Sequence, residues 1–162
     1  MVKGLHMQKL LILNHLLYSS YILNQNMDCI FCKIAKKEIP SKIITETKNS
    51  IAFLDAFPVS RGHTLVIPKN HYEKVQDMTD IDNNDLFDVV HKVISKVYKL
   101  TGSTLLAIHN GKDSGQEIPH VHFHLIPRES HDQVGPVHSM FKDRPKLSDK
   151  ELDELCAKIK NM

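Results

Sequence analysis

Residues 120–127 read His120-Val121-His122-Phe123-His124-Leu125-Ile126-Pro127. Polar and apolar residues alternate, which is typical of a β-strand whose two faces meet different surroundings. Three imidazoles would share one face, and the apolar residues between them would point into a core. A polar face that happens to be rich in histidine, or adventitious metal capture, is the alternative. The alternation favours a half-buried strand that carries chemistry.

The spacing of these histidines limits what they can do together. A strand rises about 3.3 Å per residue, so the backbones of His120 and His124 should lie about 13 Å apart. A metal ion needs nitrogen ligands at about 2 Å, so all three rings cannot share one ion. They can instead divide the work along an extended substrate as nucleophile, proton carrier and cation. At an anionic phosphorus centre, the middle ring can attack while a neighbour stabilises the developing charge.

The loop before this strand reads His109-Asn110-Gly111-Lys112-Asp113-Ser114-Gly115-Gln116-Glu117. Its two glycines permit close approach of the backbone, and the amides of Asn110 and Gln116 could help to cradle an anion. An ordinary glycine-containing turn is the alternative. The position of the loop directly before the histidine strand favours the phosphate interpretation.

The rest of the chain predicts an α+β domain around an antiparallel sheet. Alternating patterns place strands at residues 42–46, 50–55, 63–67, 104–109 and 120–126, the first three forming a meander. A long helix over residues 82–101 should bury Leu86, Val90, Val93, Val97 and Leu100 and end at Gly102. A last helix from residue 149 follows the capping pattern of Ser148 with Glu151, and should bury Leu152, Leu155 and Ile159.

Length and composition limit the class of protein. The chain has 162 residues, 41% of them hydrophobic, a formal net charge of +2 and three cysteines. We expect one domain over residues 27–162 with no need for a disulfide framework, preceded by an extension over residues 1–26 that is dispensable, disordered or a targeting signal. The charge disfavours nucleic acid as a partner, and no apolar run is long enough to span a membrane. The predicted location is the cytoplasm, with the nucleus as a second site, unless residues 1–26 direct the chain to an organelle or the secretory route.

Three segments carry a resemblance to the histidine triad (HIT) family, in particular to its Hint-like nucleoside phosphoramidase branch. They are CIFCKIAKKEIPSKII (29–44), IAFLDAFPVSRGHTLVIPKNH (51–71) and HNGKDSGQEIPHVHFHLIPR (109–128). The resemblance implies a five-stranded sheet with one long helix and a C-terminal helix. It also implies a homodimer with a continuous ten-stranded sheet, and a purine nucleotide bound over the histidine strand.

The resemblance assigns roles to the histidines. His122 would attack the α-phosphorus of a nucleoside 5′-phosphoramidate, the amine would leave, and water would release the nucleoside monophosphate from a nucleotidyl-histidine intermediate. His124 would contact the phosphate, His63 would complete the cluster, and His120 would orient the nucleophile. No organic cofactor is implied.

Other family positions map onto the substrate site. Asp55 would hold the ribose hydroxyls, unless it is only a turn aspartate. The phosphate loop would comprise Asn110, Gly115 and Gln116, and the base pocket would be formed by Phe31, Ile34, Phe53 and Leu54. Glu117 stands where the best-known Hint enzymes carry Ser or Thr, which leaves the preferred leaving group open: a carboxylate could act as an acid or repel polyphosphate.

Cys29 and Cys32 form a C-x-x-C pair, a spacing that lets two thiolates bind one tetrahedral metal ion. An untouched thiol pair is the alternative. In zinc-containing HIT relatives the matching ligands are completed by the positions of His71 and His120, so the resemblance implies a structural zinc site. Cys156 is expected to pack on the apolar side of the last helix.

Two other functions remain open. A dinucleoside polyphosphate hydrolase of the Fhit-like type would share the fold and the nucleophile, although the C-x-x-C pair and Glu117 argue against it. A non-catalytic nucleotide-binding or regulatory protein would not need an intact nucleophile.

Overall fold

The computed structural model describes residues 29–140 and 145–162. The predicted extension over residues 1–26 lies outside the described residues. The described residues fall into two compact units, one up to Glu129 and one from Ser130 onward, and the first contains the sheet.

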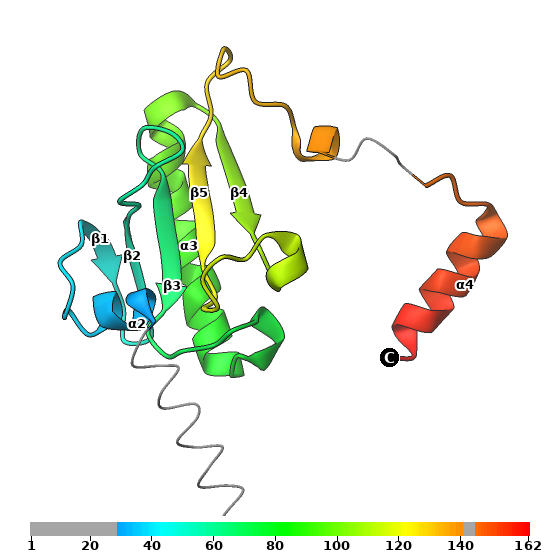
Figure 1. Cartoon of the computed structure of the whole chain (residues 1–162), viewed down its shortest axis with the longest axis horizontal. Helices are drawn as coiled ribbons and strands as arrows, with labels where there is room; N and C mark the ends of the chain where they lie inside the picture. The colour runs from blue at the N-terminus through cyan, green and yellow to red at the C-terminus, as the bar shows by residue number, and fades with distance from the viewer. Residues whose placement is uncertain (1–28, 141–144) are drawn as a thin grey trace, which may run out of the picture. The chain divides into compact units, whose positions relative to one another are not determined.

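A five-stranded sheet with the order β1-β2-β3-β5-β4 forms the centre of the first unit (Figure 1). Every neighbouring pair is antiparallel, which confirms the predicted α+β class. The first three strands form the predicted meander. The strand bounds are β1 Ile43–Glu46, β2 Ser50–Leu54, β3 Thr64–Pro68, β4 Thr104–Ile108 and β5 Phe123–Pro127.

The histidine strand is shorter than predicted. β5 begins at Phe123, so His120 and His122 lie before its paired part. Ahead of the strand, Val121 donates its N–H to the carbonyl of Tyr72 at 2.7 Å. The alternation continues beyond the ladder: Val121, Phe123 and Leu125 all belong to the core on one face.

Helix α3 (Asp80–Thr101) covers that face of the sheet (Figure 1). The Thr79 side chain caps its first turn by accepting from the N–H of Asp82, and Gly102 ends it at φ 77°, as predicted. The buried apolar face comprises Leu86, Val89, Val90, Val93 and Val97. The prediction for Leu100 was wrong, since this side chain is 61% exposed at the end of the helix.

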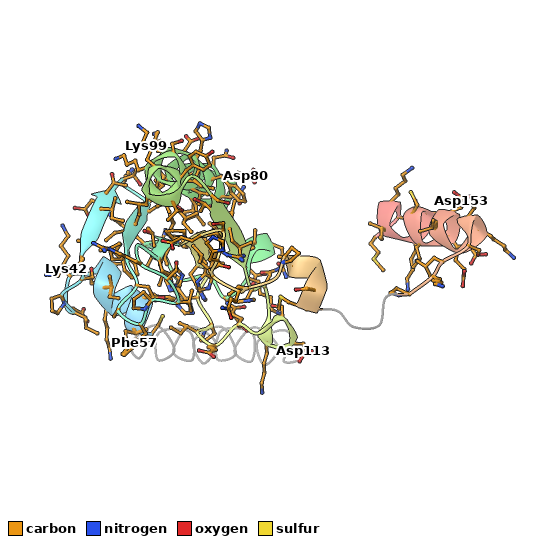
Figure 2. The ribbon with its side chains drawn as sticks, turned by 90° about the horizontal axis from the view of Figure 1, so that it is seen from above. Lys42, Phe57, Asp80, Lys99, Asp113 and Asp153 are labelled. Atoms are coloured by element: carbon orange, nitrogen blue, oxygen red, sulfur yellow. The ribbon has the colours of Figure 1, made fainter. Side chains whose placement is uncertain are left out.

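A short helix, α2 (Ile30–Ala35), packs on the opposite face and was not predicted. Its buried residues join a second core with residues of β2 and β3: Phe31, Cys32, Ile34, Ile51, Phe53, Leu65 and Ile67. In Figure 2, Phe57 and Asp113 lie on the side of the sheet away from the labelled ends of α3, Asp80 and Lys99. The sheet thus separates an α3 core from the face that carries the histidines.

The second unit contains helix α4 (Asp149–Lys160). Its N-terminus has the predicted capping box between Ser148 and Glu151. The predicted burial was wrong: Leu152, Leu155 and Ile159 are 49%, 44% and 69% exposed, and Cys156 is exposed as well. The amphipathic pattern formed the helix, and within the second unit its apolar side is exposed. No helix in the described parts of the chain is both long and apolar enough to cross a membrane.

Candidate active site and metal cluster

A cavity of about 390 Å³ opens on the α2 side of the sheet, within the size range of small-ligand sites. One part of its wall is apolar and another carries imidazoles and carboxylates. The lining comprises Phe31, Ile34, Phe53, Asp55, Ala56, Phe57, Val59, His63, Leu65, His109, Gly115, Glu117, Ile118, His122 and His124.

His122 lies in this wall and is only 5% exposed. Its Nδ1 lies 2.6 Å from the carbonyl oxygen of His120. A carbonyl can only accept, so Nδ1 carries the proton and donates it. The neutral ring therefore keeps its free lone pair on Nε2, which is the tautomer a nucleophilic imidazole needs.

His124, His63 and Asp55 form a continuous chain of contacts. The Nδ1 of His124 lies 3.0 Å from the Nε2 of His63, and the two rings stack at 5.2 Å between centroids. On its other side, the Nδ1 of His63 lies 3.2 Å from an oxygen of Asp55. Among the described residues, nothing bonds to the buried Nε2 of His124. One ring nitrogen at the end of this chain is therefore left for a ligand.

Burial keeps these imidazoles neutral. Loss of solvation lowers the pKa of His63 and of His122 below the ordinary histidine value. The same cause, together with the neighbouring rings of His122, His63 and His109, lowers the pKa of His124 to about 4. At neutral pH the rings therefore hold lone pairs and exchangeable protons rather than fixed positive charge.

His109 was not predicted as a site residue, yet it lines the cavity. Its ring meets that of His124 edge to face, with centroids 5.5 Å apart. The last residue of β4, Ile108, pairs with Phe123, and the next positions along are 109 and 122. Knowledge of this pairing would have found His109; the sequence pattern alone gave no such signal.

The loop over residues 109–118 is fastened rather than open. The Asn110 amide accepts from the N–H of Val75 at 3.0 Å and donates to Gln76 at 2.9 Å. The Gln116 amide accepts from the N–H of Gly111 at 2.7 Å and donates to the carbonyl of Glu73 at 2.8 Å. Neither amide lines the cavity, so in this structure both hold the loop in place.

Two glycines in this loop have positive φ, 111° at Gly111 and 92° at Gly115. Glycine adopts this conformation without steric cost, as expected for a tight loop. Gly115 and Glu117 both reach the cavity wall.

Three of the four predicted base-pocket residues line the cavity, and the fourth, on β2, does not. Phe31, Ile34 and Phe53 line the cavity, whereas Leu54 does not and is 42% exposed. Successive strand residues point to opposite faces, so Leu54 lies on the far side of the sheet from Phe53. Phe57 and Val59, which were not predicted, extend the apolar wall and are 89% and 72% exposed.

A second cluster lies at the other end of the histidine row. Cys29, Cys32, His71 and His120 place one potential ligand atom each within 4.8 Å of one another. The sulfur of Cys29 lies 3.4 Å from the Nδ1 of His120, and that of Cys32 lies 3.3 Å from the Nδ1 of His71 and 3.6 Å from that of His120. Zinc bonds of about 2.3 Å to sulfur and 2.0–2.1 Å to nitrogen, at a tetrahedral angle, put the two ligand atoms about 3.6 Å apart. These four residues are close enough to hold a metal ion.

Neighbouring contacts prepare these ligands. The Nε2 of His120 donates to the carbonyl of Pro68 at 2.9 Å, which leaves Nδ1 bare toward the sulfurs. His71 lies between Asn70 and Tyr72, which both donate to the buried carboxylate of Asp82 on α3. A hydrogen bond with Cys32 holds the pKa of Cys29 well below its ordinary value, so this thiol readily becomes the thiolate that a metal binds.

Comparison with known proteins identifies the family. The HIT domain signature matches residues 36–131. The chain is 49% identical over 100 residues to adenosine 5′-monophosphoramidase HNT1 of Saccharomyces cerevisiae, covering 62% of each protein. It is 34% identical over 135 residues to adenylylsulfatase HINT3 of Arabidopsis thaliana, covering 82% of this chain and 68% of that one.

A solved structure agrees with the sequence comparisons. A HIT family protein from Bacillus subtilis superposes with a TM-score of 0.75 at 33% identity, covering 83% of this chain and 96% of that one. The signature spans more than half of the chain, and the fold and the histidine row agree with it. The chain therefore belongs to the HIT domain family.

Proposed function

We propose that the protein hydrolyses purine nucleoside 5′-phosphoramidates through a covalent intermediate on His122, and that it also accepts aminoacyl adenylates, in which the leaving group is a carboxylate joined to phosphorus through oxygen. The tautomer of His122 carries the proposal, because its donated Nδ1 proton leaves Nε2 free to attack. The name of the yeast relative, an adenosine 5′-monophosphoramidase, supports this substrate class.

The cavity suits the parts of such a substrate. The apolar wall around Phe31 and Phe53 would hold a base, and Asp55, which lines the same cavity and contacts His63, would accept from ribose hydroxyls. Apolar walls recognise a flat ring without reading its substituents closely, so we expect weak discrimination between adenine and guanine.

The reaction would proceed in two displacements. The Nε2 lone pair of His122 bonds to the α-phosphorus while the P–N bond breaks and the amine leaves with a proton taken from the site. Water then attacks the same phosphorus, the P–N bond to His122 breaks, and the nucleoside monophosphate leaves with the ring restored. The His124 ring and the backbone of the loop at Gly115 would donate hydrogen bonds that stabilise negative charge on the phosphate oxygens.

The cluster of Cys29, Cys32, His71 and His120 would hold zinc as a structural ion. Four protein ligands leave no open position for water, so the ion would stabilise the fold. Through His120 it would also steady the carbonyl that orients His122.

Glu117 bears on which group leaves. Glu117 is an exposed residue of the cavity lining, and its negative charge there would attract a cationic amine and repel a polyphosphate or sulfate. This favours phosphoramidates over dinucleoside polyphosphates, and also over adenylyl sulfate, the substrate named for the Arabidopsis relative.

The decisive experiment compares substrates and one variant. The protein would be incubated with lysine-linked AMP phosphoramidate, diadenosine triphosphate and adenylyl sulfate, alongside His122→Ala. We expect fastest release of AMP from the phosphoramidate, no turnover by the variant, and an acid-labile label on His122 after rapid quench. Faster turnover of diadenosine triphosphate would favour the Fhit-like function, and binding without turnover would favour a regulatory nucleotide-binding role.

We also propose a homodimer joined at β4. The two sheet edges differ: β1 carries a bulge and the Glu46 carboxylate paired with Lys37 and Lys69, features that block edge pairing. β4 reads Thr104-Leu105-Leu106-Ala107-Ile108, without a charge, and Leu106 is 43% exposed. Sedimentation should give a dimer for the wild type and a monomer for Leu106→Glu; a wild-type monomer would exclude it.

A further inference from the structure

The Nδ1 of His63 has two competing neighbours. An oxygen of the Asp55 carboxylate lies 3.2 Å away and can only accept a proton. The backbone N–H of Val59 lies 3.4 Å away and can only donate. A ring nitrogen carries either a proton or a lone pair, so it can satisfy one neighbour at a time.

The choice at His63 sets the tautomer of His124. If Nδ1 of His63 keeps its proton and directs it at the Asp55 carboxylate, its Nε2 is bare and accepts from the Nδ1 of His124, whose own Nε2 is then also bare. If Nδ1 of His63 instead accepts from Val59, its Nε2 donates to the Nδ1 of His124. The Nε2 of His124 then carries a proton.

The state of the carboxylate decides between these arrangements. The contact between His63 Nδ1 and Asp55 has an ion-pair distance, and attraction between an N–H and an ionised carboxylate is stronger than a hydrogen bond between neutral groups, so the free protein should keep the proton on His63 Nδ1. Asp55 already accepts from the N–H of Phe57 at 2.9 Å, and its side chain is 19% exposed at the cavity. A hydroxyl donor arriving in the cavity would compete with His63 for the remaining acceptor positions.

We propose that Asp55 is a positioning residue that couples occupation of its carboxylate by ligand hydroxyls to the tautomers of His63 and His124. The inference rests on the proposed function in one respect, since the hydroxyls are taken to be those of a ribose. When these hydroxyls bind Asp55, the Nδ1 of His63 accepts from the N–H of Val59, and the Nε2 of His63 donates to the Nδ1 of His124. The buried Nε2 of His124, which has no partner among the described residues, then carries the proton. The nitrogen then donates to a phosphate oxygen, whereas its bare lone pair would repel one.

This coupling means that the ribose hydroxyls must bind Asp55 before His124 can donate to the phosphate. Inorganic phosphate, or a nucleotide without its ribose hydroxyls, would meet a His124 that offers no donor. A complete nucleotide would create the donor as it binds. The structure thus links recognition of the sugar to the chemistry at phosphorus through the three side chains.

Nitrogen-15 NMR of the imidazole rings tests the coupling directly, because bare and protonated ring nitrogens resonate far apart. In the free wild type we expect protons on the Nδ1 of both His63 and His124. Saturating adenosine should move both protons to Nε2, whereas 2′,3′-dideoxyadenosine at matched occupancy should not. In Asp55→Ala without ligand, both protons should already be on Nε2.

A matched control uses the other carboxylate of the cavity. Glu117→Gln removes a negative charge from the same wall without removing a contact to His63, so the adenosine-dependent change should persist. If that change is lost in Glu117→Gln, general charge and not Asp55 sets the tautomers, and the proposal is overturned.

Other outcomes are equally decisive. Unchanged tautomers in Asp55→Ala, or equal effects of adenosine and its dideoxy analogue, would overturn the coupling. The ligand atoms of Asp55, His63 and His124 also lie within 4.8 Å of one another, so resonances that shift on adding EDTA would identify a bound cation in place of the relay. If adenosine does not bind, the proposed function and the ligand coupling both fail, while Asp55→Ala still reports whether the carboxylate sets the tautomers.

Kinetics give a second measure. Removing both ribose hydroxyls from an AMP phosphoramidate should lower kcat about tenfold in the wild type as well as raise KM, because a donor to the reacting phosphate is lost. A merely structural ribose contact would change KM alone. A dideoxy substrate that changes KM alone would therefore count against the coupling.

Discussion

The two ends of the histidine row place the same side chain in opposite surroundings. His120 is fully buried, fixed by the carbonyl of Pro68 and directed at two sulfurs. His124 is partly buried, its Nδ1 lies against the Nε2 of His63, and among the described residues its Nε2 has no partner. At the first end, the bare Nδ1 of His120 faces two sulfurs and could bind a metal ion with them. At the other end, the Nε2 of His124 is left to bond a ligand. His122, between them, takes its orientation from the backbone of the first and faces the cavity of the second.

We expect the largest change in activity from replacing His122, the proposed nucleophile, and we compare it with replacing His120, the proposed metal ligand. His122→Gln should lower phosphoramidase activity at least about a thousandfold because it removes the attacking nitrogen, and it should keep its metal. His120→Gln keeps the backbone carbonyl that orients His122, so it should lose metal while still forming the covalent label. Rapid-quench labelling and metal analysis of both variants check this. Equal metal loss in both would show that the two ends are not separate.

The next effect concerns the metal end alone. Cys32→Ser, or chelation, should remove the ion and lower the free energy of unfolding by about 3–4 kcal/mol, because an ion that binds only the folded chain stabilises it. Urea unfolding with and without chelator measures this. Cys156→Ser is the matched control, since that thiol is exposed on α4 and should change neither metal content nor stability. Wild-type protein that unfolds identically with chelator would refute the metal site.

The pH dependence of stability should reveal the ligand end. His124 has a folded pKa of about 4, below the ordinary value of 6.5, because burial disfavours its charged form. Between pH 6.5 and about 4, the His124 imidazole is therefore protonated in the unfolded chain but neutral in the folded chain. Stability is full above pH 6.5 and falls as pH decreases through this window, by about 1–2 kcal/mol.

This comparison is best made in the Cys32→Ser background, so that acid release of metal does not contribute. Replacing His124 by Gln there should flatten the slope of unfolding free energy against pH. An unchanged slope would mean that His124 is not held neutral by the fold.

The smallest effect should come from the residue that touches both ends. The ring of Phe31 meets His120 and His122 edge to face, at 5.8 and 5.1 Å between centroids. Phe31→Leu nearly conserves volume, so we expect a stability loss of about 1 kcal/mol, unchanged metal content and a several-fold rise in KM. Calorimetry, metal analysis and steady-state kinetics check the three. Loss of metal in this variant would indicate that the ring couples the ends instead of separating them.

Residues near one another in the sequence were predicted well. The alternation over residues 120–126 identified the face of each side chain because side-chain direction in an extended chain repeats every two residues. The long helix and its end at Gly102 followed from local periodicity and capping. Burial of Leu100 and of the α4 residues was predicted wrongly because an amphipathic pattern forms a helix without showing what covers it.

The sequence by itself determined which reactive groups the protein carries: three alternating imidazoles, a pair of thiols and a loop with two glycines. Only the tertiary structure decided how those groups are used. Strand pairing brought His109 beside the row, the turn before β3 brought Asp55 and Val59 to the same nitrogen of His63, and the fastened loop turned Asn110 and Gln116 away from the cavity. Such contacts join residues far apart in the chain, and their hydrogen-bond directions depend on distances of a few ångströms that no local pattern encodes.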